Sequence, residues 1–104
     1  MFDRDAAISM VKQFIAQCQI ENIHFDKVIL FGSTLRNEAS EDSDIDVLLA
    51  SEQFGINKWD NLGLIARVNK KFYRIDPHPF PTSYFLKGDP FIDEIKKVGL
   101  EISV

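Results

Sequence analysis

The chain has 104 residues, 45% of them hydrophobic, and this length and composition predict one globular domain, residues 1–104, with its own core. Its 16 acidic and 12 basic residues give a net charge of −4, which argues against a dedicated nucleic-acid-binding protein. The single cysteine excludes an internal disulfide bond, and no apolar run approaches the length of a membrane span. We therefore expect a cytoplasmic protein that does not enter a membrane.

The first predicted elements are a helix over residues 5–19 and a strand over residues 28–31. The helix has apolar residues at helical spacing: Ile8, Val11, Phe14, Ile15 and Cys18. Because Cys18 lies on this face, we expect a packed core cysteine rather than a reactive thiol. The strand is a short apolar run that ends at Gly32-Ser33.

The turn at Gly32-Ser33 has the residues of an anion site. Glycine lets the backbone approach a phosphate closely, and amide groups at the start of a helix can hold the anion together with a serine hydroxyl. The sequence predicts a short helix that begins at Thr34 and Leu35, followed by a solvated loop over residues 37–43.

The second strand begins at Ser43-Asp44-Ile45-Asp46 and continues as an apolar run over residues 47–50. Alternation along a strand predicts that Asp44 and Asp46 point to one face. Two carboxylates at the start of a buried strand are unfavourable unless a positive charge lies between them. Mg²⁺, which binds one or two protein carboxylates together with substrate phosphates, is the usual solution.

A connector over residues 51–57 leads to an amphipathic helix over residues 58–72. The predicted packing face of this helix consists of Trp59, Leu62, Ile65, Ala66 and Phe72. A strand over residues 73–76 follows, and we expect Pro77 and Pro79 to stop it, because proline cannot continue a hydrogen-bonded ladder.

The C-terminal part predicts one more helix. Asp89 and Pro90 are a typical helix start, because aspartate caps a helix and proline is favoured in its first turn. The remaining elements are a loop over residues 81–88, the helix over residues 91–98 and a terminal strand or tail over residues 100–104.

Two segments together resemble a known signature. The run Gly32-Ser33-Thr34-Leu35-Arg36, a short polar loop and Ser43-Asp44-Ile45-Asp46 resemble the DNA polymerase beta-like nucleotidyltransferase superfamily. The small size resembles its minimal nucleotidyltransferase branch, many members of which are antitoxins of a HEPN-type ribonuclease toxin. Most relatives have a glycine after the arginine, where this chain has Asn37, but asparagine also tolerates a left-handed backbone.

The order of elements agrees with the fold that this resemblance implies. We expect an α/β (α+β) domain with a small mixed β-sheet flanked by helices, the polymerase beta-like nucleotidyltransferase fold. A parallel doubly wound sheet is less attractive, because the loop between the first two strands is too short for a crossover helix.

The resemblance also implies an activity and a set of site residues. The activity is transfer of a nucleotidyl group, AMP from ATP, to a hydroxyl of a partner protein, with a HEPN-type toxin as the expected partner. In the superfamily a third strand carries a third carboxylate, and Asp76 is the only acidic residue between Asp60 and Asp89. The expected roles are two Mg²⁺ ions bound by Asp44, Asp46 and Asp76, ATP phosphates held by Gly32 and Ser33, and phosphate contact or loop attachment by Arg36.

Several alternatives stay open at this point. The domain can be an antitoxin that neutralises its partner by contact alone, or can modify a small molecule such as an aminoglycoside, although nothing in the sequence supports a pocket for one. Asp76 can be a turn residue at a strand end, because aspartate before proline is common there. For His78 we expect a position at the surface or beside the site, because Pro77 interrupts strict alternation from Asp76.

Overall fold

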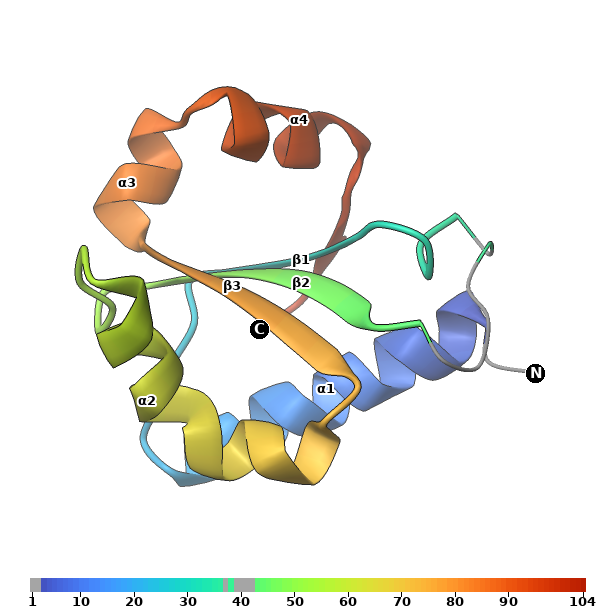
Figure 1. Cartoon of the computed structure of the whole chain (residues 1–104), viewed down its shortest axis with the longest axis horizontal. Coiled ribbons are helices and arrows are strands. Elements are labelled where there is room, and N and C mark those ends of the chain that lie inside the picture. The colour runs from blue at the N-terminus through green and yellow to red at the C-terminus, as the bar shows by residue number, and fades with distance from the viewer. Residues whose placement is uncertain (1–2, 37, 39–42) are drawn as a thin grey trace.

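The computed structural model describes residues 3–36, 38 and 43–104. This part of the chain forms a four-stranded sheet of order β3-β2-β1-β4, with α1 and α2 on one face and α3 and α4 on the other (Figure 1). In chain order the elements are α1 (Arg4–Ile20), β1 (Lys27–Phe31), β2 (Ile45–Ser51), α2 (Lys58–Asn69), the 3-10 helix η1 (Lys70–Phe72), β3 (Ile75–Pro81), α3 (Thr82–Lys87), α4 (Pro90–Val98) and β4 (Leu100–Ile102). The predicted mixed sheet flanked by helices is confirmed.

The directions of the strands place the C-terminal end of β1 and the N-terminal ends of β2 and β3 on the same side of the sheet. Strand β1 is antiparallel to β2 and to β4, whereas β2 and β3 are parallel. The C-terminal end of β1 therefore lies beside the N-terminal ends of β2 and β3. In this register Phe31 is opposite Asp46, and Asp46 is opposite Asp76.

Two apolar clusters hold the layers together. The larger one lies between the sheet and the helices α1 and α2, and it contains Phe14 and Cys18, both with no exposed surface. Burial raises the pKa of the Cys18 thiol to about 12, so this cysteine is a packing residue, as the sequence predicted. The smaller cluster joins the other face of the sheet, through Leu48, to Phe85 of α3 and Ile92 of α4.

Strand β3 is longer than the sequence predicted, and the expectation that Pro77 and Pro79 would end it was wrong. The strand includes both residues and ends at Pro81. The carbonyl of Arg74 accepts a hydrogen bond from the amide of Ile45, 2.7 Å away. Alternation from Arg74 directs the backbone of every second residue to β2 and leaves all three prolines on the free side. Because β3 is an edge strand, no ladder hydrogen bond is lost there.

Two local predictions were also wrong. Residues 82–87, predicted as a loop, form α3, which is anchored by the buried Phe85 and ends at Gly88 with φ +81°. The short helix expected from Thr34 is only a hydrogen-bonded turn over residues 33–36, closed by the bond from Arg36 N to Gly32 O at 3.4 Å. Asn37 and most of the predicted polar loop lie outside the described residues.

The inward face of α2 differs from the predicted one. Its buried residues are Asn61, Ile65 and Val68, which follow one another at intervals of four and three. Trp59 precedes Asn61 by two positions and therefore points elsewhere, with 77% of its surface exposed. The apolar pattern was right about Ile65, and the partly buried Leu62 and Phe72 also pack against the core, but a buried asparagine occupies the place expected of a large apolar side chain.

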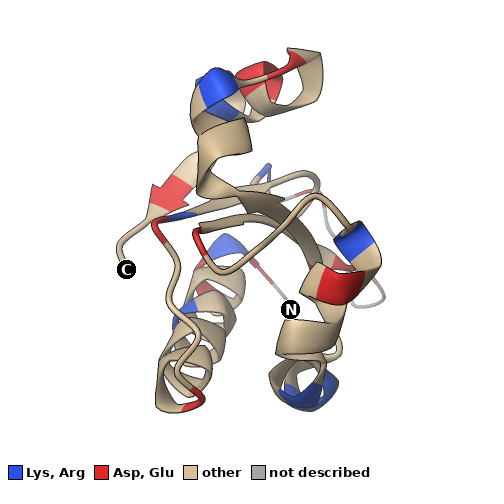
Figure 2. Ribbon diagram, turned by 90° about the vertical axis from the view of Figure 1, so that its left-hand side faces the viewer, with Lys and Arg blue, Asp and Glu red and all other residues tan. Residues whose placement is uncertain are grey.

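Lys and Arg residues are scattered over several elements and form no single basic face in the view of Figure 2. Within the described residues, no helix has the length and apolar character needed to cross a membrane.

Candidate functional site

The first component of the site is Gly32, which directly follows β1. Its backbone has φ +83°, a left-handed conformation that favours glycine. A Cβ atom on Gly32 would lie only 2.5 Å from Oδ2 of Asp46, whose pairing partner Phe31 is the residue before the glycine. The missing side chain at Gly32 thus leaves room for the Asp46 carboxylate.

Three side chains from β2 and β3 lie close together near the N-terminal ends of these two strands. Asp46 and Asp76 are paired in register on the two parallel strands. The Nε2 atom of His78 lies 3.4 Å from Oδ1 of Asp46 and 3.5 Å from Oδ2 of Asp76. One possible ligand atom from each residue lies within 4.8 Å of the other two. Carboxylate oxygens and an imidazole nitrogen are common ligands of divalent cations, so this donor set fits a metal ion.

The charges of this cluster are not balanced within it. Burial raises the pKa of Asp46, and the neighbouring Asp76 carboxylate raises it further. The hydrogen bond and charge of His78 act in the opposite direction. The side chains of Asp46 and His78 are only 30% and 25% exposed, so solvent relieves the repulsion between the two carboxylates incompletely.

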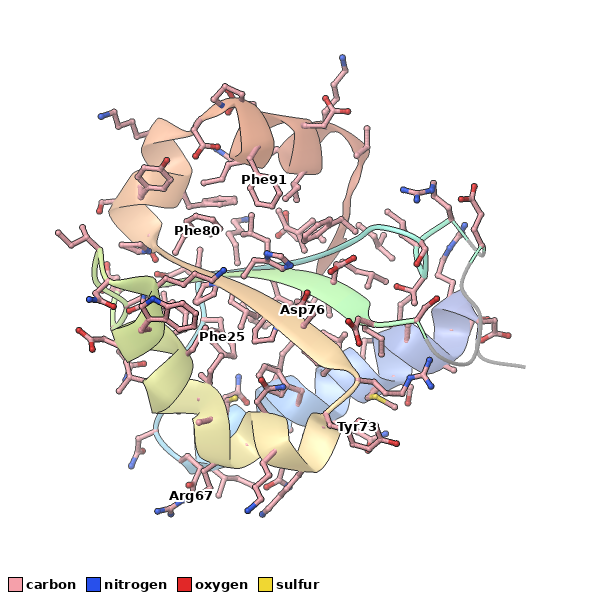
Figure 3. All side chains as sticks on the ribbon, viewed as in Figure 1. Phe25, Arg67, Tyr73, Asp76, Phe80 and Phe91 are labelled. Atoms are coloured by element: carbon pink, nitrogen blue, oxygen red, sulfur yellow. The ribbon has the colours of Figure 1, made fainter. Side chains whose placement is uncertain are left out.

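The imidazole of His78 is positioned by aromatic packing. Its ring centroid lies 5.1 Å from that of Phe31 at the end of β1 and 5.9 Å from that of Phe91 in α4. The Phe31 and Phe91 rings meet edge to face at 5.9 Å. In Figure 3, Phe80 and Phe91 lie between the sheet and the helices α3 and α4, whereas Phe25 lies on the opposite side.

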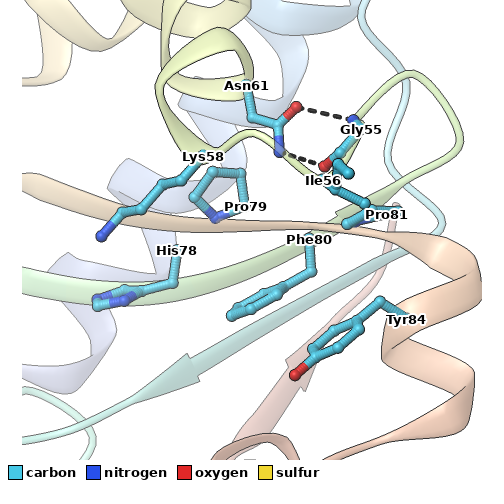
Figure 4. Close-up of a pocket in the computed structure, with 9 residues that line it drawn as sticks. All are labelled: Gly55, Ile56, Lys58, Asn61, His78, Pro79, Phe80, Pro81 and Tyr84. Carbon is cyan, nitrogen blue, oxygen red and sulfur yellow. Dashed lines mark hydrogen bonds between the residues drawn. The ribbon is translucent and has the colours of Figure 1, made fainter.

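A pocket of about 350 Å³ begins at His78 and extends along the free edge of β3 (Figure 4). Residues 78–81, residues 55–56, the first turn of α2 and Tyr84 line it. The Phe80 and Tyr84 rings are stacked, with centroids 5.6 Å apart. Asn61 closes the upper side with two hydrogen bonds of 2.8 Å to the backbone of Gly55, one donated and one accepted. The pocket and the carboxylate cluster share His78.

Asp44 and Asp46 were predicted to form a pair, but only Asp46 belongs to the cluster with Asp76 and His78. Asp44 is exposed, lies just before β2, and is not a member of the three-residue cluster. The segment before it is held by Arg74, whose Nη2 donates to the Ser43 carbonyl at 2.9 Å. Asp44 therefore has a fixed backbone neighbour and a solvent-facing side chain at the rim of the site.

Arg36 points to solvent. Its Nε forms an ion pair with Oε2 of Glu38 at 3.1 Å, and the Arg36 side chain is 58% exposed. The turn is attached to the body of the protein by Arg4 instead, whose Nε donates to the Leu35 carbonyl at 2.6 Å.

His78 is the residue whose place the sequence left open between the surface and the neighbourhood of the site. The position at the surface or beside the site was expected because Pro77 interrupts strict alternation from Asp76. Because β3 runs through Pro77, alternation holds, and Asp76 and His78 share a face. The signal was present as the i, i+2 spacing, and recognising it required knowing that β3 is an edge strand.

Comparisons with known proteins identify the family and the fold. The family model described as a nucleotidyltransferase domain matches residues 11–102. A protein of Methanocaldococcus jannaschii named "Putative protein adenylyltransferase MJ0141" is 33% identical over 97 residues, which span 91% of this chain and 97% of that protein. A crystal structure titled as a "putative nucleotidyltransferase" from Sulfolobus solfataricus has a similar fold, with a TM-score of 0.67 at 17% identity over 94% of this chain and 80% of that one.

Proposed function

The chain belongs to the nucleotidyltransferase domain family, and we propose that it transfers AMP from ATP to a hydroxyl group of a partner protein. The observation that carries the proposal is the in-register pair of Asp46 and Asp76 beside the left-handed Gly32. The name of the Methanocaldococcus relative supports the choice of an adenylyl group and of a protein acceptor.

In the proposed reaction the acceptor oxygen attacks the α-phosphorus of ATP. The new bond joins this oxygen to the α-phosphorus, and the bond from the α-phosphorus to the oxygen bridging to the β-phosphorus breaks. Pyrophosphate leaves with the electron pair of that bond, and the hydroxyl proton is released to a base or to water. The products are an adenylylated protein and pyrophosphate.

The turn after β1 has the backbone suited to the leaving side of this reaction. Gly32 allows close approach, and Ser33 adds a hydroxyl group, so the two would hold the β- and γ-phosphates. In an in-line displacement the acceptor approaches opposite to the leaving group. With pyrophosphate at the end of β1, the acceptor side is β3, where Asp76 and the pocket along the free edge lie.

Asp44, Asp46 and Asp76 would hold two Mg²⁺ ions in this proposal. A bound divalent cation neutralises charge on the transferred and leaving phosphates and favours ionisation of the attacking hydroxyl. Asp46 occupies the centre of the arrangement, between Gly32 and Asp76. Asp44 is exposed, so its side chain can turn toward an ion with little loss of packing.

The acceptor is proposed to belong to a HEPN-type toxin, as the resemblance of the sequence implies. The Asp76 side chain is 49% exposed, so a hydroxyl group on a macromolecule can approach this side of the cluster, which supports a macromolecular acceptor. The alternative from the sequence, an antitoxin that acts by contact alone, is tested by the same experiment.

The experiment is a transfer assay with a purified HEPN-type protein from the same source. ATP labelled at the α-phosphate should label the partner, whereas ATP labelled at the γ-phosphate should not, because pyrophosphate is the leaving group. Label from γ-labelled ATP would indicate phosphoryl transfer and contradict the proposal.

The variant Asp76→Asn separates catalysis from contact. It should retain binding of Mg-ATP, through the phosphates and Asp46, and lose transfer by orders of magnitude, since each ~1.4 kcal/mol of lost transition-state stabilisation is a factor of ten. Asp60→Asn, an exposed aspartate in the first turn of α2, is the matched control and should transfer normally. If neither wild type nor variant labels the partner but both inhibit it fully, the contact mechanism replaces the enzymatic one.

A further inference from the structure

We propose that His78 is a metal ligand, and that with Asp46 and Asp76 it forms a site that selects Zn²⁺ or Mn²⁺ over Mg²⁺. The inference deepens the proposed function, because it concerns the ion on the acceptor side, next to Asp76. It replaces the Mg²⁺ proposed for the acceptor side by Zn²⁺ or Mn²⁺, and it keeps the Mg²⁺ that accompanies ATP on Asp44, Asp46 and the phosphates.

The contacts of His78 are too long for good hydrogen bonds. Nitrogen and oxygen atoms in such bonds are typically about 2.7–3.2 Å apart. The Nε2 atom lies 3.4 Å from the Asp46 carboxylate and 3.5 Å from that of Asp76. A nitrogen almost equidistant from two carboxylate oxygens, and slightly too far from both, matches three ligands placed around a central ion.

Two of the three separations, those measured from Nε2 of His78, bear on the coordination geometry, and the two carboxylate oxygens lie within 4.8 Å of each other. Two ligand atoms that each lie about 2.1 Å from an ion and are 3.4–3.5 Å apart subtend roughly 110° at the ion. This is the tetrahedral angle that Zn²⁺ prefers. Mg²⁺ demands near-ideal octahedral geometry, with ligands at right angles and therefore only about 3.0 Å apart.

The chemistry of the donors points the same way. Mg²⁺ is bound through oxygen ligands and keeps much of its water, whereas an imidazole nitrogen suits zinc and other transition metals. Among divalent ions the affinity for such a mixed site rises from Mn²⁺ to Zn²⁺. The site should therefore bind Zn²⁺ most tightly, Mn²⁺ next and Mg²⁺ least.

The ring of His78 is held in place before any ion arrives. Phe31 and Phe91 pack against it from β1 and α4, and only 25% of the His78 side chain is exposed. A ligand that is fixed by packing loses little conformational entropy when it binds.

The chain contains only two histidines, and the second one is a natural control. His24 lies in the exposed connector after α1, and its described hydrogen bonds are made by its backbone: the amide donates to Gln53 and the carbonyl accepts from Ser51. His78→Ala and His24→Ala therefore remove the same side chain from the partly exposed cluster and from the surface. Circular dichroism and thermal unfolding establish that both variants are folded.

The experiment measures metal binding to the metal-free protein without nucleotide. Zn²⁺ is titrated against a chelating indicator, Mn²⁺ is followed by the paramagnetic resonance of the free ion, and Mg²⁺ by calorimetry. We expect His78→Ala to weaken Zn²⁺ and Mn²⁺ binding at least tenfold and Mg²⁺ binding less than twofold, whereas His24→Ala changes none of them. His78→Asp, which restores a ligand but makes it an oxygen, should shift the preference toward Mg²⁺.

Failure of the inference and failure of the proposed function give different results. Equal Zn²⁺ and Mn²⁺ affinities in wild type and His78→Ala would overturn the role of His78, even if wild type transfers AMP. Loss of Zn²⁺ and Mn²⁺ binding in the variant, with no transfer by wild type, would overturn the enzymatic function and leave the metal site standing. A proportionate loss of all three ions in His78→Ala would overturn the selectivity.

Discussion

The two ends of strand β2 differ in whether their polar side chains have complementary hydrogen-bond partners. At the C-terminal end Ser51 is fully buried, and its hydroxyl donates to the His24 carbonyl at 2.6 Å and accepts from the Gln53 amide at 3.1 Å. Nearby, Asn61 exchanges two hydrogen bonds with the backbone of Gly55. The donors and acceptors of these two side chains are paired with backbone groups, as expected of buried polar atoms in a stable protein.

At the N-terminal end of β2 the neighbours are alike rather than complementary. Asp46 faces Asp76 across the strand pair, and the described group beside both carboxylates is His78. Two acceptors placed together destabilise the metal-free protein, and a cation relieves them. The comparison teaches that donor–acceptor pairing identifies a structural end of the sheet, whereas unbalanced acceptors mark the end where a ligand belongs.

The largest expected effect is that of Asp46→Asn on transfer. The substitution removes a proposed ligand of both ions, so the transfer rate should fall by about three orders of magnitude or more. In chelator the same variant should melt at a higher temperature than wild type, because it removes a partly buried charge that faces another carboxylate.

The pH dependence of that stabilisation follows from the raised pKa of Asp46. Above the folded-state pKa the ionised carboxylate destabilises the folded protein, and this destabilisation is lost as the pH falls through that pKa toward the usual aspartate value. The gain in melting temperature should thus be largest near pH 7 and shrink in acid. An equal gain in melting temperature near pH 7 and in acid would contradict the charge argument. A gain in melting temperature for the exposed control Asp60→Asn would contradict it as well.

Gly32→Ala should have the next largest effect, because the alanine needs a left-handed backbone and its Cβ would lie 2.5 Å from the Asp46 carboxylate. Strain of this kind is about 1–3 kcal/mol, and the displaced carboxylate should weaken metal binding as well. Gly63→Ala is the control, since its Cβ meets nothing within 4 Å and alanine should stabilise α2 by about 0.5–1 kcal/mol. Urea unfolding and calorimetry with Mg²⁺ measure the two effects, and equal behaviour of both variants would refute the close approach.

Asn61→Ala tests the structural end of the comparison. It removes both hydrogen bonds to Gly55 from a side chain that is 2% exposed, so the free energy of unfolding should fall by about 1–3 kcal/mol. The affinity for Mg²⁺, Mn²⁺ and Zn²⁺ should not change. A loss of metal affinity comparable to that of Asp46→Asn would contradict the assignment of a structural role to the C-terminal end of β2 and a ligand-binding role to its N-terminal end.

The sequence predicted the site best where its signals are local. Apolar runs of strand length, a glycine at a turn and aspartates two residues apart are read directly from the chain, and β1, β2 and the position of Asp46 followed from them. Asp76 was selected because the resemblance implies a third carboxylate on a third strand, and Asp76 is the only acidic residue between Asp60 and Asp89. The register that places it opposite Asp46 is a property of the folded sheet.

What the sequence could not show depends on tertiary context. Proline ends a central strand but not an edge strand, and the position of β3 in the sheet is set by pairing far along the chain. The same expectation about Pro77 left His78 between a surface position and one beside the site. Helix α3 is only six residues long and depends on the burial of Phe85. A helix of this length is too short to show a periodic apolar pattern in the sequence.

The smallest effect is expected for Trp59→Ala, at a residue that the sequence placed in the core. Trp59 is 77% exposed because the inward face of α2 is built on Asn61, Ile65 and Val68. Its removal should change the free energy of unfolding by no more than about 0.5 kcal/mol, as for other surface substitutions. Ile65→Ala, on the buried face of the same helix, should lower it by about 2–5 kcal/mol. Urea unfolding of both variants measures the contrast. A loss above about 1 kcal/mol for Trp59→Ala would mean that the indole packs against the protein, and that the inward face of α2 is wider than its buried residues indicate.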